Sequence, residues 1–441
     1  MSFVFEFPPM KEYVLANGLR IIWLSEFTQP VITITLQIPV GKMHDPILLE
    51  GIGELTANHM SRASLSLSSE KFSEKFENAG ASVYVDIREE YSIFGARMLC
   101  NVSEDIIPHF WEMVVNPAFD KDDFKQLKKE MITGLKAEFS NNTIIAYRHF
   151  FAQLFGPKHF AGRTATVNSV KKIKISNIRD YYENYISPQN STLIIAGALS
   201  VKDMQKTWER LFSTWGKKRI PKFRNNNSIP SLKCNKIRLI NKPEYTQTTI
   251  LMGHKGINEL HGDKVPLAVA NYILGGGNFS SRLMAEIRSA TGQTYGINSQ
   301  LSCLKYYGIF TISTSTQNHQ LKSVLTSIID VYKEYVKNGP TENEIEKAKQ
   351  FASGNMAFEL EGLSNVIEKL LWLRFFKREN SYLEQYESIL LPVSKERVLD
   401  ALQKQFRSDN FVIIAVGKRN EIQSQLENFG EVAHYSSHAT P

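Results

Sequence analysis

The stretch that decides the fold is Thr28-Gln29 followed by Val31-Ile32-Thr33-Ile34-Thr35-Leu36, because it returns 218 positions later as Thr246-Gln247 followed by Thr248-Thr249-Ile250-Leu251-Met252. Short runs rich in Ile, Val and Thr are typical of buried β-strands. A second pair of such runs repeats at an offset of 219, as Thr192-Leu193-Ile194-Ile195-Ala196 and Phe411-Val412-Ile413-Ile414-Ala415. Each member of this pair follows a helical stretch and precedes a glycine and a polar helix. Two anchors with nearly the same offset predict a duplicated chain.

The duplication divides the 441 residues into an N-terminal domain, 1–215, and a C-terminal domain, 235–441. In each half, strands open the unit, amphipathic helices fill the middle, and a strand and a helix close it. Such segregation predicts an α+β fold with two homologous halves, each a mainly antiparallel sheet with helices packed on one face. In 125–139, for example, apolar residues recur every four positions, as expected for a helix lying on a sheet.

The junction 216–234 carries most of the net charge of the protein. The chain has 52 Lys and Arg against 45 Asp and Glu, and six of the basic residues lie in this junction, which has no acidic residue. The junction also contains Pro221, Pro230 and the run Asn225-Asn226-Asn227-Ser228, a composition typical of a solvated linker. We therefore interpret 216–234 as a basic linker, and the near-neutral remainder gives no support for a nucleic-acid partner.

The N-terminal sequence and the cysteines favour a cytoplasmic protein without a membrane segment. Met1–Met10 has neither a basic and apolar secretory signal nor the Arg-rich and Ser-rich character of a transit peptide. No apolar run reaches the ~18–20 residues that span a bilayer. Cys100, Cys234 and Cys303 are far apart and in no metal-type spacing, so we expect reduced thiols.

The most informative segment of the second half runs from Gly275-Gly276-Gly277-Asn278-Phe279-Ser280-Ser281-Arg282-Leu283 through Arg288 to Gly292-Gln293-Thr294-Tyr295-Gly296. It lacks the spacing of a phosphate-binding loop and instead predicts a tight turn into a helix that Ser280 or Ser281 begins and Gly292 ends. Arg288 then lies in the last helical turn, and Tyr295 begins an alternating strand with Ile297 and Ser299 on the same face. Guanidinium and phenol both donate hydrogen bonds and could converge there. On spacing alone the simpler interpretation holds, in which Arg288 only favours the helix C-terminus and Tyr295 is an edge aromatic.

This segment resembles the second-domain signature of the M16 peptidases, the pitrilysin, insulinase and mitochondrial-processing-peptidase group. The signature reads Gly-Gly-x-Phe-Ser-Ser-Arg-Leu, followed by an Arg and, seven residues later, a Tyr. Leu15-Ala16-Asn17-Gly18-Leu19-Arg20 is similar to the start of the family, and the segment from Leu154 to Arg163 to its Leu-Phe-Gly-x-His-Pro-Tyr-Gly-Arg stretch. The resemblance covers nearly the whole chain and implies a fold of the LuxS/MPP-like metallohydrolase type.

Active members of this family carry an inverted zinc motif, His-x-x-Glu-His, with a third ligand, Glu, about 76 residues later. Two His at i and i+4 share one helix face, and the Glu between them activates the metal-bound water. In this chain Glu54 and Asn58 stand at the positions of the two His, Ala57 at that of the general base, and Gly134 at that of the third ligand. We therefore expect no metal, no cofactor and no catalysis by this chain alone.

Other histidines do not rebuild the zinc site. His59 lies one residue beyond the motif and points about 100° away around the helix, so we interpret it as packed or surface-exposed. His254 and His261 flank a turn. His434 and His438 share the spacing i, i+4, but they lie in a Ser-rich tail that we expect to be disordered. A remodelled metal site built around Glu54 ranks last, because the number and softness of the ligands both fail.

In the M16 peptidases the Arg and Tyr of the second half hold the substrate carbonyl and the developing oxyanion at a zinc site, and some bacterial members divide zinc motif and Arg/Tyr pair between two subunits. The resemblance therefore implies a zinc-free, non-catalytic subunit that supplies Arg288 and Tyr295 to a zinc-bearing homologue acting on a peptide substrate. The partner would make a heterodimer, and without it the chain could form a homodimer. The alternative is a non-enzymatic structural or peptide-binding homologue, in which Arg288 and Tyr295 are inherited packing.

Overall fold

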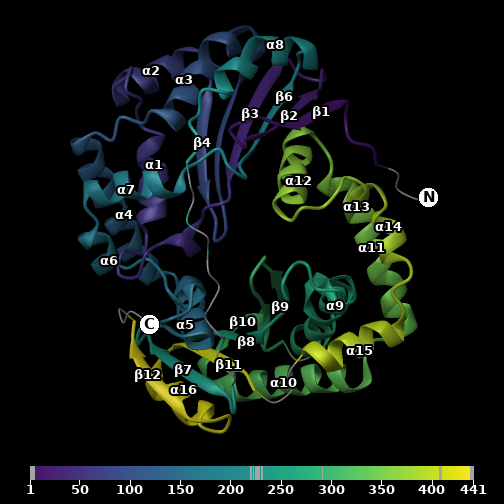
Figure 1. Cartoon of the computed structure of the whole chain (residues 1–441). Helices are drawn as coiled ribbons and strands as arrows, with labels where there is room; N and C mark the ends of the chain where they lie inside the picture. Colours follow the sequence, from purple (N-terminus) through teal and green to yellow (C-terminus); the bar gives the residue numbers. More distant parts are fainter. Residues whose placement is uncertain are drawn as a thin grey trace.

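Residues 5–218, 221, 223, 229, 232–290, 292–406 and 410–437 are described by the computed structural model. They form two six-stranded sheets at opposite ends of a ring-like arrangement of helices (Figure 1). The first sheet has the order β1-β2-β6-β3-β5-β4. Its strands are β1 (Met10–Val14), β2 (Arg20–Ser25), β3 (Val31–Ile38), β4 (Ser82–Ile87), β5 (Ser92–Leu99) and β6 (Thr192–Gly197).

The second sheet repeats this topology with the order β12-β7-β11-β8-β10-β9. Its strands are β7 (Lys236–Asn241), β8 (Gln247–Lys255), β9 (Thr294–Cys303), β10 (Gly308–Gln317), β11 (Val412–Gly417) and β12 (Val432–Ser436). The strands named in the two sequence repeats, β3 with β8 and β6 with β11, occupy the same places in the two sheets and pair antiparallel in both. The predicted duplication and the α+β fold class are therefore confirmed.

One edge differs between the two sheets. The first sheet ends in β1, which pairs antiparallel with β2, whereas the second ends in β12, which pairs parallel with β7. His434 lies within β12, opposite Leu239, so the prediction of a disordered tail is wrong for this residue, and His438 lies outside the described residues. The Ser-rich composition was misleading because an edge strand is held by backbone pairing and needs little side-chain burial.

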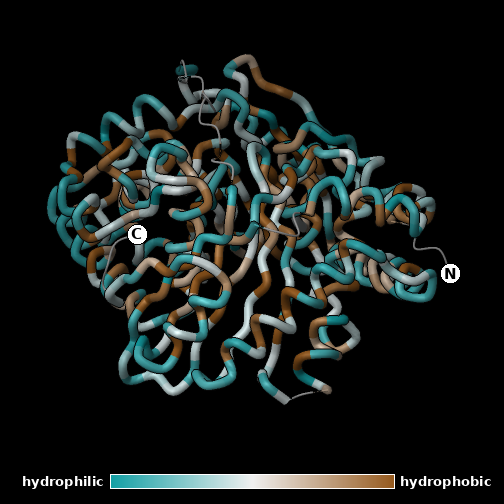
Figure 2. Tube along the Cα trace, turned by 90° about the horizontal axis from the view of Figure 1, so that it is seen from below, coloured by the Kyte–Doolittle hydropathy of each residue, from teal (hydrophilic) through white to brown (hydrophobic). Residues whose placement is uncertain are grey.

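Helices cover one face of each sheet. On the first sheet these are α1 (Ile52–Met60), α2 (Ser69–Asn78), α3 (Ser103–Val115), α4 (Lys121–Ala137), α6 (Val167–Lys172), α7 (Ile175–Tyr185) and α8 (Val201–Phe212). On the second sheet they are α9 (Lys264–Asn271), α10 (Leu321–Asn338), α11 (Glu342–Glu359), α14 (Tyr386–Leu390), α15 (Lys395–Gln405) and α16 (Arg419–Leu426). Hydrophobic and hydrophilic stretches succeed one another along the coiled parts of the trace (Figure 2), as expected for amphipathic helices on a sheet.

The second face of each sheet is covered by a helix from the other half. Helix α5 (Asn142–Phe155) belongs to the first half by sequence, but its buried side chains, such as Phe150, pack on β8 and β11 of the second sheet. Helix α12 (Leu363–Phe375) and the adjoining α13 (Ser381–Glu384) belong to the second half, but Leu370 packs against β2 and β6 of the first sheet. Because successive strand residues face opposite sides, each central strand contributes to two cores.

Polar contacts reinforce this exchange. Arg374 of α12 donates to the carboxylate of Glu12 on β1, at 2.6 Å, and the Arg374 side chain is only 9% exposed. The carboxylate of Glu90, at the end of the β4–β5 hairpin, accepts the backbone N–H of Lys305 from the β9–β10 hairpin. Charge-assisted bonds in partly buried positions are stronger than surface ion pairs. These polar contacts therefore join the two halves in addition to the packing of α5 and α12.

The predicted linker 216–234 lies partly outside the described residues. Phe223, which is described, contacts the rings of His44, Phe160 and Tyr306, so the segment is not wholly solvated as its composition predicted. The reason is that its basic and Asn-rich composition conceals one aromatic residue that packs between the halves. Within the described part of the chain, no helix combines the length and the apolar character that crossing a bilayer requires.

Candidate functional site

The positions of the zinc motif lie on α1 and α4. Helix α1 begins after Gly51, which has a φ of 99°, and the carboxylate of Asp45 accepts the backbone N–H groups of Gly51 at 2.6 Å and Gly53 at 3.0 Å. This carboxylate satisfies donors that a helix N-terminus leaves free. The first turn of α1 is thus fixed in place although it holds no metal-binding histidine.

The residues at the four motif positions are engaged in other contacts or carry no ligand atom. Glu54 lies 3.5 Å from the ammonium of Lys42, and the Asn58 amide donates to the carbonyl of Glu54 at 2.9 Å. Ala57 is buried in the core, at 3% exposure. Gly134 is exposed, and a Cβ built there would meet no atom within 4 Å. Within the described ranges, no group of three or more His, Cys, Asp or Glu side chains is arranged to hold a metal ion.

Beside these positions lies a cavity of about 370 Å³ that contains several ion pairs. Glu54 and Gly134 line it from the first half, and Tyr307 lines it from the second. Cations and carboxylates of its wall pair as Lys42–Glu54 at 3.5 Å, Arg163–Glu50 at 3.3 Å and Arg148–Glu138 at 2.6 Å. Side chains of the same protein therefore neutralise these three carboxylates of the cavity.

Two carboxylates of this cavity have no cationic partner at ion-pair distance in the described part of the chain. Burial raises the pKa of Asp45 to about 7, against the opposing effect of its bonds to Gly51 and Gly53. Burial likewise raises the pKa of Glu89 to about 7, although Lys42 lies near enough to oppose the shift. Both groups therefore titrate near neutral pH instead of near pH 4.

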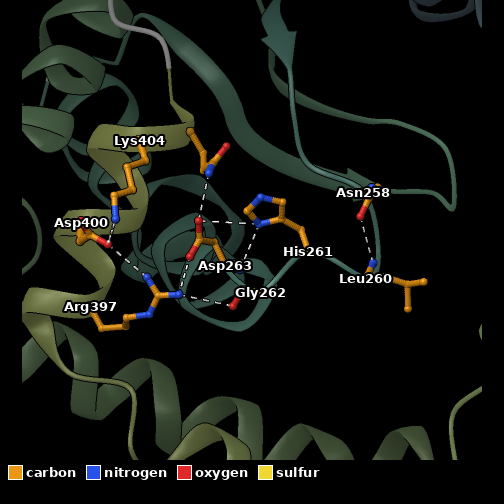
Figure 3. Close-up of polar contacts among 9 residues, drawn as sticks. Asn258, Leu260, His261, Gly262, Asp263, Arg397, Asp400 and Lys404 are labelled. Carbon is orange, nitrogen blue, oxygen red and sulfur yellow. Dashed lines mark hydrogen bonds and ion pairs between the residues drawn. The ribbon is translucent and has the colours of Figure 1, made fainter.

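The histidines singled out in the sequence contact aromatic rings, a hydroxyl or a carboxylate of the fold. His59 is 2% exposed and lies between the rings of Phe119 and Phe124, and burial lowers its pKa. His254 is bonded to the Tyr332 hydroxyl at 2.7 Å. His261 lies beside Asp263, which binds Arg397 and Gln405 of α15 (Figure 3). Of the two interpretations given for His59, packed or surface-exposed, its burial supports the first.

The second-half motif begins where α9 ends. A π-helical turn, Tyr272–Gly276, follows α9, a tight turn over Asn278–Ser280 comes next, and the helical segment then begins after Ser281 and continues as the π-helical turn Met284–Ser289. Gly292 has a φ of 63°, and its N–H bonds the carbonyl of Arg288, as predicted for a helix end. The Ser281 hydroxyl donates to the Asn278 carbonyl, so it braces the turn and does not cap the helix.

Two arginines of this motif have different surroundings. Arg282 donates to Glu344 at 2.7 and 2.8 Å, to Glu334 at 3.0 Å and to the carbonyl of Gly339 at 3.2 Å. The guanidinium of Arg288 makes no hydrogen bond or ion pair within the described part of the chain. Arg282 is therefore part of the fold, whereas the donors of Arg288 are available.

Arg288 and Tyr295 come together, and Phe279 joins them. The Cζ atom of Arg288 lies 5.6 Å from the ring centre of Tyr295 and 4.7 Å from that of Phe279. Tyr295 is 91% exposed and Phe279 is 72% exposed. A guanidinium and a phenol with free donors thus lie side by side at the protein surface.

The predicted face of Tyr295 is wrong. Ile297 is opposite Thr314 and Thr294 is opposite Thr316, so Tyr295 and Gly296 together face the single residue Ser315. This β-bulge reverses the alternation. Ile297 and Ser299 share one face, as predicted, and both are buried. Tyr295 instead points to solvent, and Thr294 lies on the buried face in its place.

Three contributors were missed by the sequence reasoning. Phe279 stands inside the quoted motif, but nothing in its spacing indicated contact with Arg288. Lys42 and Glu89 belong to no motif, and only the fold brings them to the cavity beside Glu54. The motif positions of the first half and the Arg288–Tyr295 pair lie on separate halves, and no contact joins them among the described residues.

Comparisons with known proteins agree with this architecture. Residues 20–155 match the family model described as Insulinase (Peptidase family M16), and residues 172–351 match the model described as Peptidase M16 inactive domain. A Bacillus subtilis protein named Uncharacterized zinc protease YmxG is 22% identical over 420 residues, covering 94% of this chain and 100% of its own length. A Helicobacter pylori protein named Non-peptidase homolog YmxG is 24% identical over 322 residues, covering 71% of this chain and 72% of its own length.

Two solved structures share the fold. One, from Pseudomonas fluorescens, is described as a peptidase M16 inactive domain, with a TM-score of 0.84, 24% identity, and coverage of 93% of this chain and 98% of that one. The other, a protease from Helicobacter pylori, has a TM-score of 0.84 at 16% identity and covers 93% of this chain and 100% of that one. With the two family models matching residues 20–155 and 172–351 in sequence order, the chain belongs to the M16 peptidase family.

Proposed function

We propose that this chain is the zinc-free subunit of a heteromeric M16-type peptidase and that it supplies Arg288 and Tyr295 to the zinc site of a partner. The observation that carries the proposal is a contrast between the two halves. The motif positions of the first half hold Glu54, paired with Lys42, and the residues Ala57, Asn58 and Gly134. Arg288 and Tyr295 of the second half lie together, and their donors have no partner among the residues that the structure describes.

The chemistry of the pair suits a substrate carbonyl that becomes an oxyanion. The guanidinium has five N–H donors and no acceptor, and the phenol adds an O–H donor. Donors that are already in position cost no reorganisation when charge develops, and loss of one such donor lowers the rate roughly 10²–10³-fold in other enzymes. Because the chain has no zinc ligands at the motif positions, the attacked carbonyl would belong to a peptide held at the partner's metal.

The exchanged helices support a partner that is a separate chain. Phe150 of α5 and Leu370 of α12 each close the sheet of the opposite half and are 0% exposed. The two halves therefore have little freedom to open and close on each other. A substrate chamber that opens would do so between this chain and a second one.

The test is reconstitution with the zinc-bearing M16 homologue that co-purifies with this chain from native cells. We expect the wild-type chain to raise the peptidase activity of that homologue, and Arg288→Ala and Tyr295→Phe each to lower the reconstituted kcat by roughly 10²–10³-fold. Arg419→Ala, a change at an exposed arginine elsewhere in the second half, serves as the control and retains full activity.

Two outcomes would overturn the proposal. If Arg288→Ala restores full activity, the pair does not serve the partner's site. If no zinc-bearing chain co-purifies, or if adding this chain does not raise the peptidase activity of one that does, the chain is a structural or peptide-binding M16 homologue.

A further inference from the structure

Phe279 is an exposed aromatic residue that the motif holds in one place. Asn278, just before it, has a φ of 49°, a left-handed conformation that Asn tolerates better than most residues. The hydroxyls of Ser280 and Ser281 donate to the carbonyls of Gly277 and Asn278, both at 2.8 Å. The turn is therefore braced on both sides of Phe279, whose ring remains 72% exposed.

The ring of Phe279 contacts the guanidinium of Arg288 and no other cation in the described part of the chain. The distance of 4.7 Å from Cζ to the ring centre is shorter than the 5.6 Å to Tyr295. The rings of Phe279 and Tyr295 make no ring contact with each other, so the guanidinium bridges them. A guanidinium on an aromatic face keeps the N–H groups at its edge available, because the ring face takes no hydrogen bond from them.

We infer that Phe279 is a positioning residue. It holds the Arg288 side chain beside Tyr295 in the orientation that leaves the N–H donors of Arg288 available. An arginine without a hydrogen-bond partner would otherwise sample several rotamers, which costs entropy when it must bind. Tyr295 alone cannot fix it, since Tyr295 is itself 91% exposed. The purpose of this positioning rests on the proposed function, but the contact does not.

The contact is tested on the full chain without a partner by NMR of the arginine side-chain Nε–H groups, with the Arg288 signal assigned by its loss in Arg288→Lys. Ring currents from Phe279 shift this signal in the wild type. Phe279→Leu moves it toward the value of a free arginine, and Phe279→Trp restores a ring-current shift. Phe358→Leu is the matched control, because Phe358 is equally exposed at 71% on α11, and it leaves the signal unchanged.

The reconstituted peptidase gives the second measurement. An exposed cation–π contact is worth about 0.5–1 kcal/mol, so Phe279→Leu lowers kcat/KM about two- to fivefold, Phe279→Trp recovers it, and Phe358→Leu leaves it unchanged. The unfolding midpoint falls by no more than about 1–4 °C in Phe279→Leu, which loses only this exposed contact, and stays at the wild-type value in Phe279→Trp and Phe358→Leu.

An Arg288 signal that does not move in Phe279→Leu overturns the inference. So does a reconstituted activity that falls in Phe279→Leu and is not recovered in Phe279→Trp. A shifted signal combined with full activity of Arg288→Ala keeps the positioning contact and refutes only the proposed function.

Discussion

Arg282 and Arg288 stand six residues apart in one motif, but we expect their replacement by Ala to affect different properties. Arg282→Ala should mainly lower the stability of the fold, and Arg288→Ala should mainly lower the activity of the reconstituted peptidase. Arg282 is 20% exposed on its side chain and joins Glu344, Glu334 and the carbonyl of Gly339. It also lies over the Tyr335 ring at 4.7 Å. Among the described residues, Arg288 makes no ion pair, and its guanidinium lies over the two exposed rings of Phe279 and Tyr295.

The magnitudes follow from these contacts. Hydrogen bonds to charged groups contribute about 1.5–3 kcal/mol when shielded and less when water reaches them. With Glu344 at 27% exposure and Glu334 at 56%, Arg282→Ala should cost about 2–3 kcal/mol. Arg288→Ala loses only exposed cation–π contacts, about 0.5–1 kcal/mol. The two costs differ by about 1–2.5 kcal/mol, so at about 2–4 °C per kcal/mol for units of this size the melting temperatures of the two variants should differ by about 2–10 °C.

The assay is thermal and urea unfolding followed by far-UV circular dichroism, on both variants and the wild type at one protein concentration. Activity in the reconstituted peptidase should show the reverse order, with Arg288→Ala the more damaging change once Arg282→Ala is measured below its own melting temperature. The reasoning is refuted if Arg288→Ala unfolds as early as Arg282→Ala, because Arg288 would then be a structural residue.

Three further predictions concern the other sites. Glu89→Gln should stabilise the protein by at most about 3 kcal/mol at pH 8 and by nothing at pH 4. Burial raises the pKa of Glu89 from 4.5 to about 7, so its cost to folding builds up as the pH rises from 4.5 to about 7 and is complete above that. Urea unfolding from pH 4 to 8 checks this, and an equal gain at both ends contradicts it. Leu370→Ala should cost about 2–5 kcal/mol and speed hydrogen exchange in β2 and β6 more than in β7 and β11, since α12 covers the first sheet. The purified chain should hold no stoichiometric zinc, whereas the triple variant Glu54→His, Asn58→His, Gly134→Glu should bind it, as measured by metal analysis after dialysis beside a variant that lacks one of the three changes.

The sequence predicted the two sheets because their central strands carry a signal that depends on local composition alone. Residues 31–36 and 192–196 are continuous apolar or β-branched runs, and the structure places both in the middle of the first sheet, as it places their repeats in the second. A strand buried on both faces must be apolar at every position. The repeat offset then indicated the duplication.

The exchange of α5 and α12 could not be predicted in the same way. The apolar residues of α5, such as Phe150 and Leu154, show that one face is buried but not which sheet buries it. The face of Tyr295 was missed for a related reason, since a bulge depends on pairing with β10 and leaves no mark in the spacing of β9. In both cases the deciding partner lies far away in the sequence.

The candidate site divides along the same line. Spacing and resemblance pointed to Glu54, Asn58, Arg288 and Tyr295, but they could not show which side chains have partners. Lys42 reaches Glu54 from the segment between β3 and α1, and Phe279 reaches Arg288 across the braced turn. Both contacts require the folded chain, so neither could be read from a motif.

The charged groups of the two halves differ in whether they have partners. In the cavity beside the zinc-motif positions, three carboxylates pair with cations of the chain, whereas the donors of Arg288 and Tyr295 have no partner among the described residues. A pocket with several carboxylates needs positive charge, which a metal ion supplies in a zinc peptidase. Here Lys42, Arg148 and Arg163 supply it, each at ion-pair distance from a carboxylate of the same cavity. The carboxylates of Glu54, Glu138 and Glu50 are therefore neutralised by cations of the chain, whereas Asp45 and Glu89 have no cation at ion-pair distance among the described residues.

The second half shows the reverse arrangement. Arg282 donates to the carboxylates of Glu344 and Glu334, so one arginine of the motif is fully engaged within the fold. Arg288, in the same short segment, is instead held by aromatic faces that take none of its N–H groups. Packing alone would be served equally well by a residue without donors, such as Met or Leu. A guanidinium and a phenol whose donors have no partner among the described residues are therefore the feature on which the proposed donor role rests.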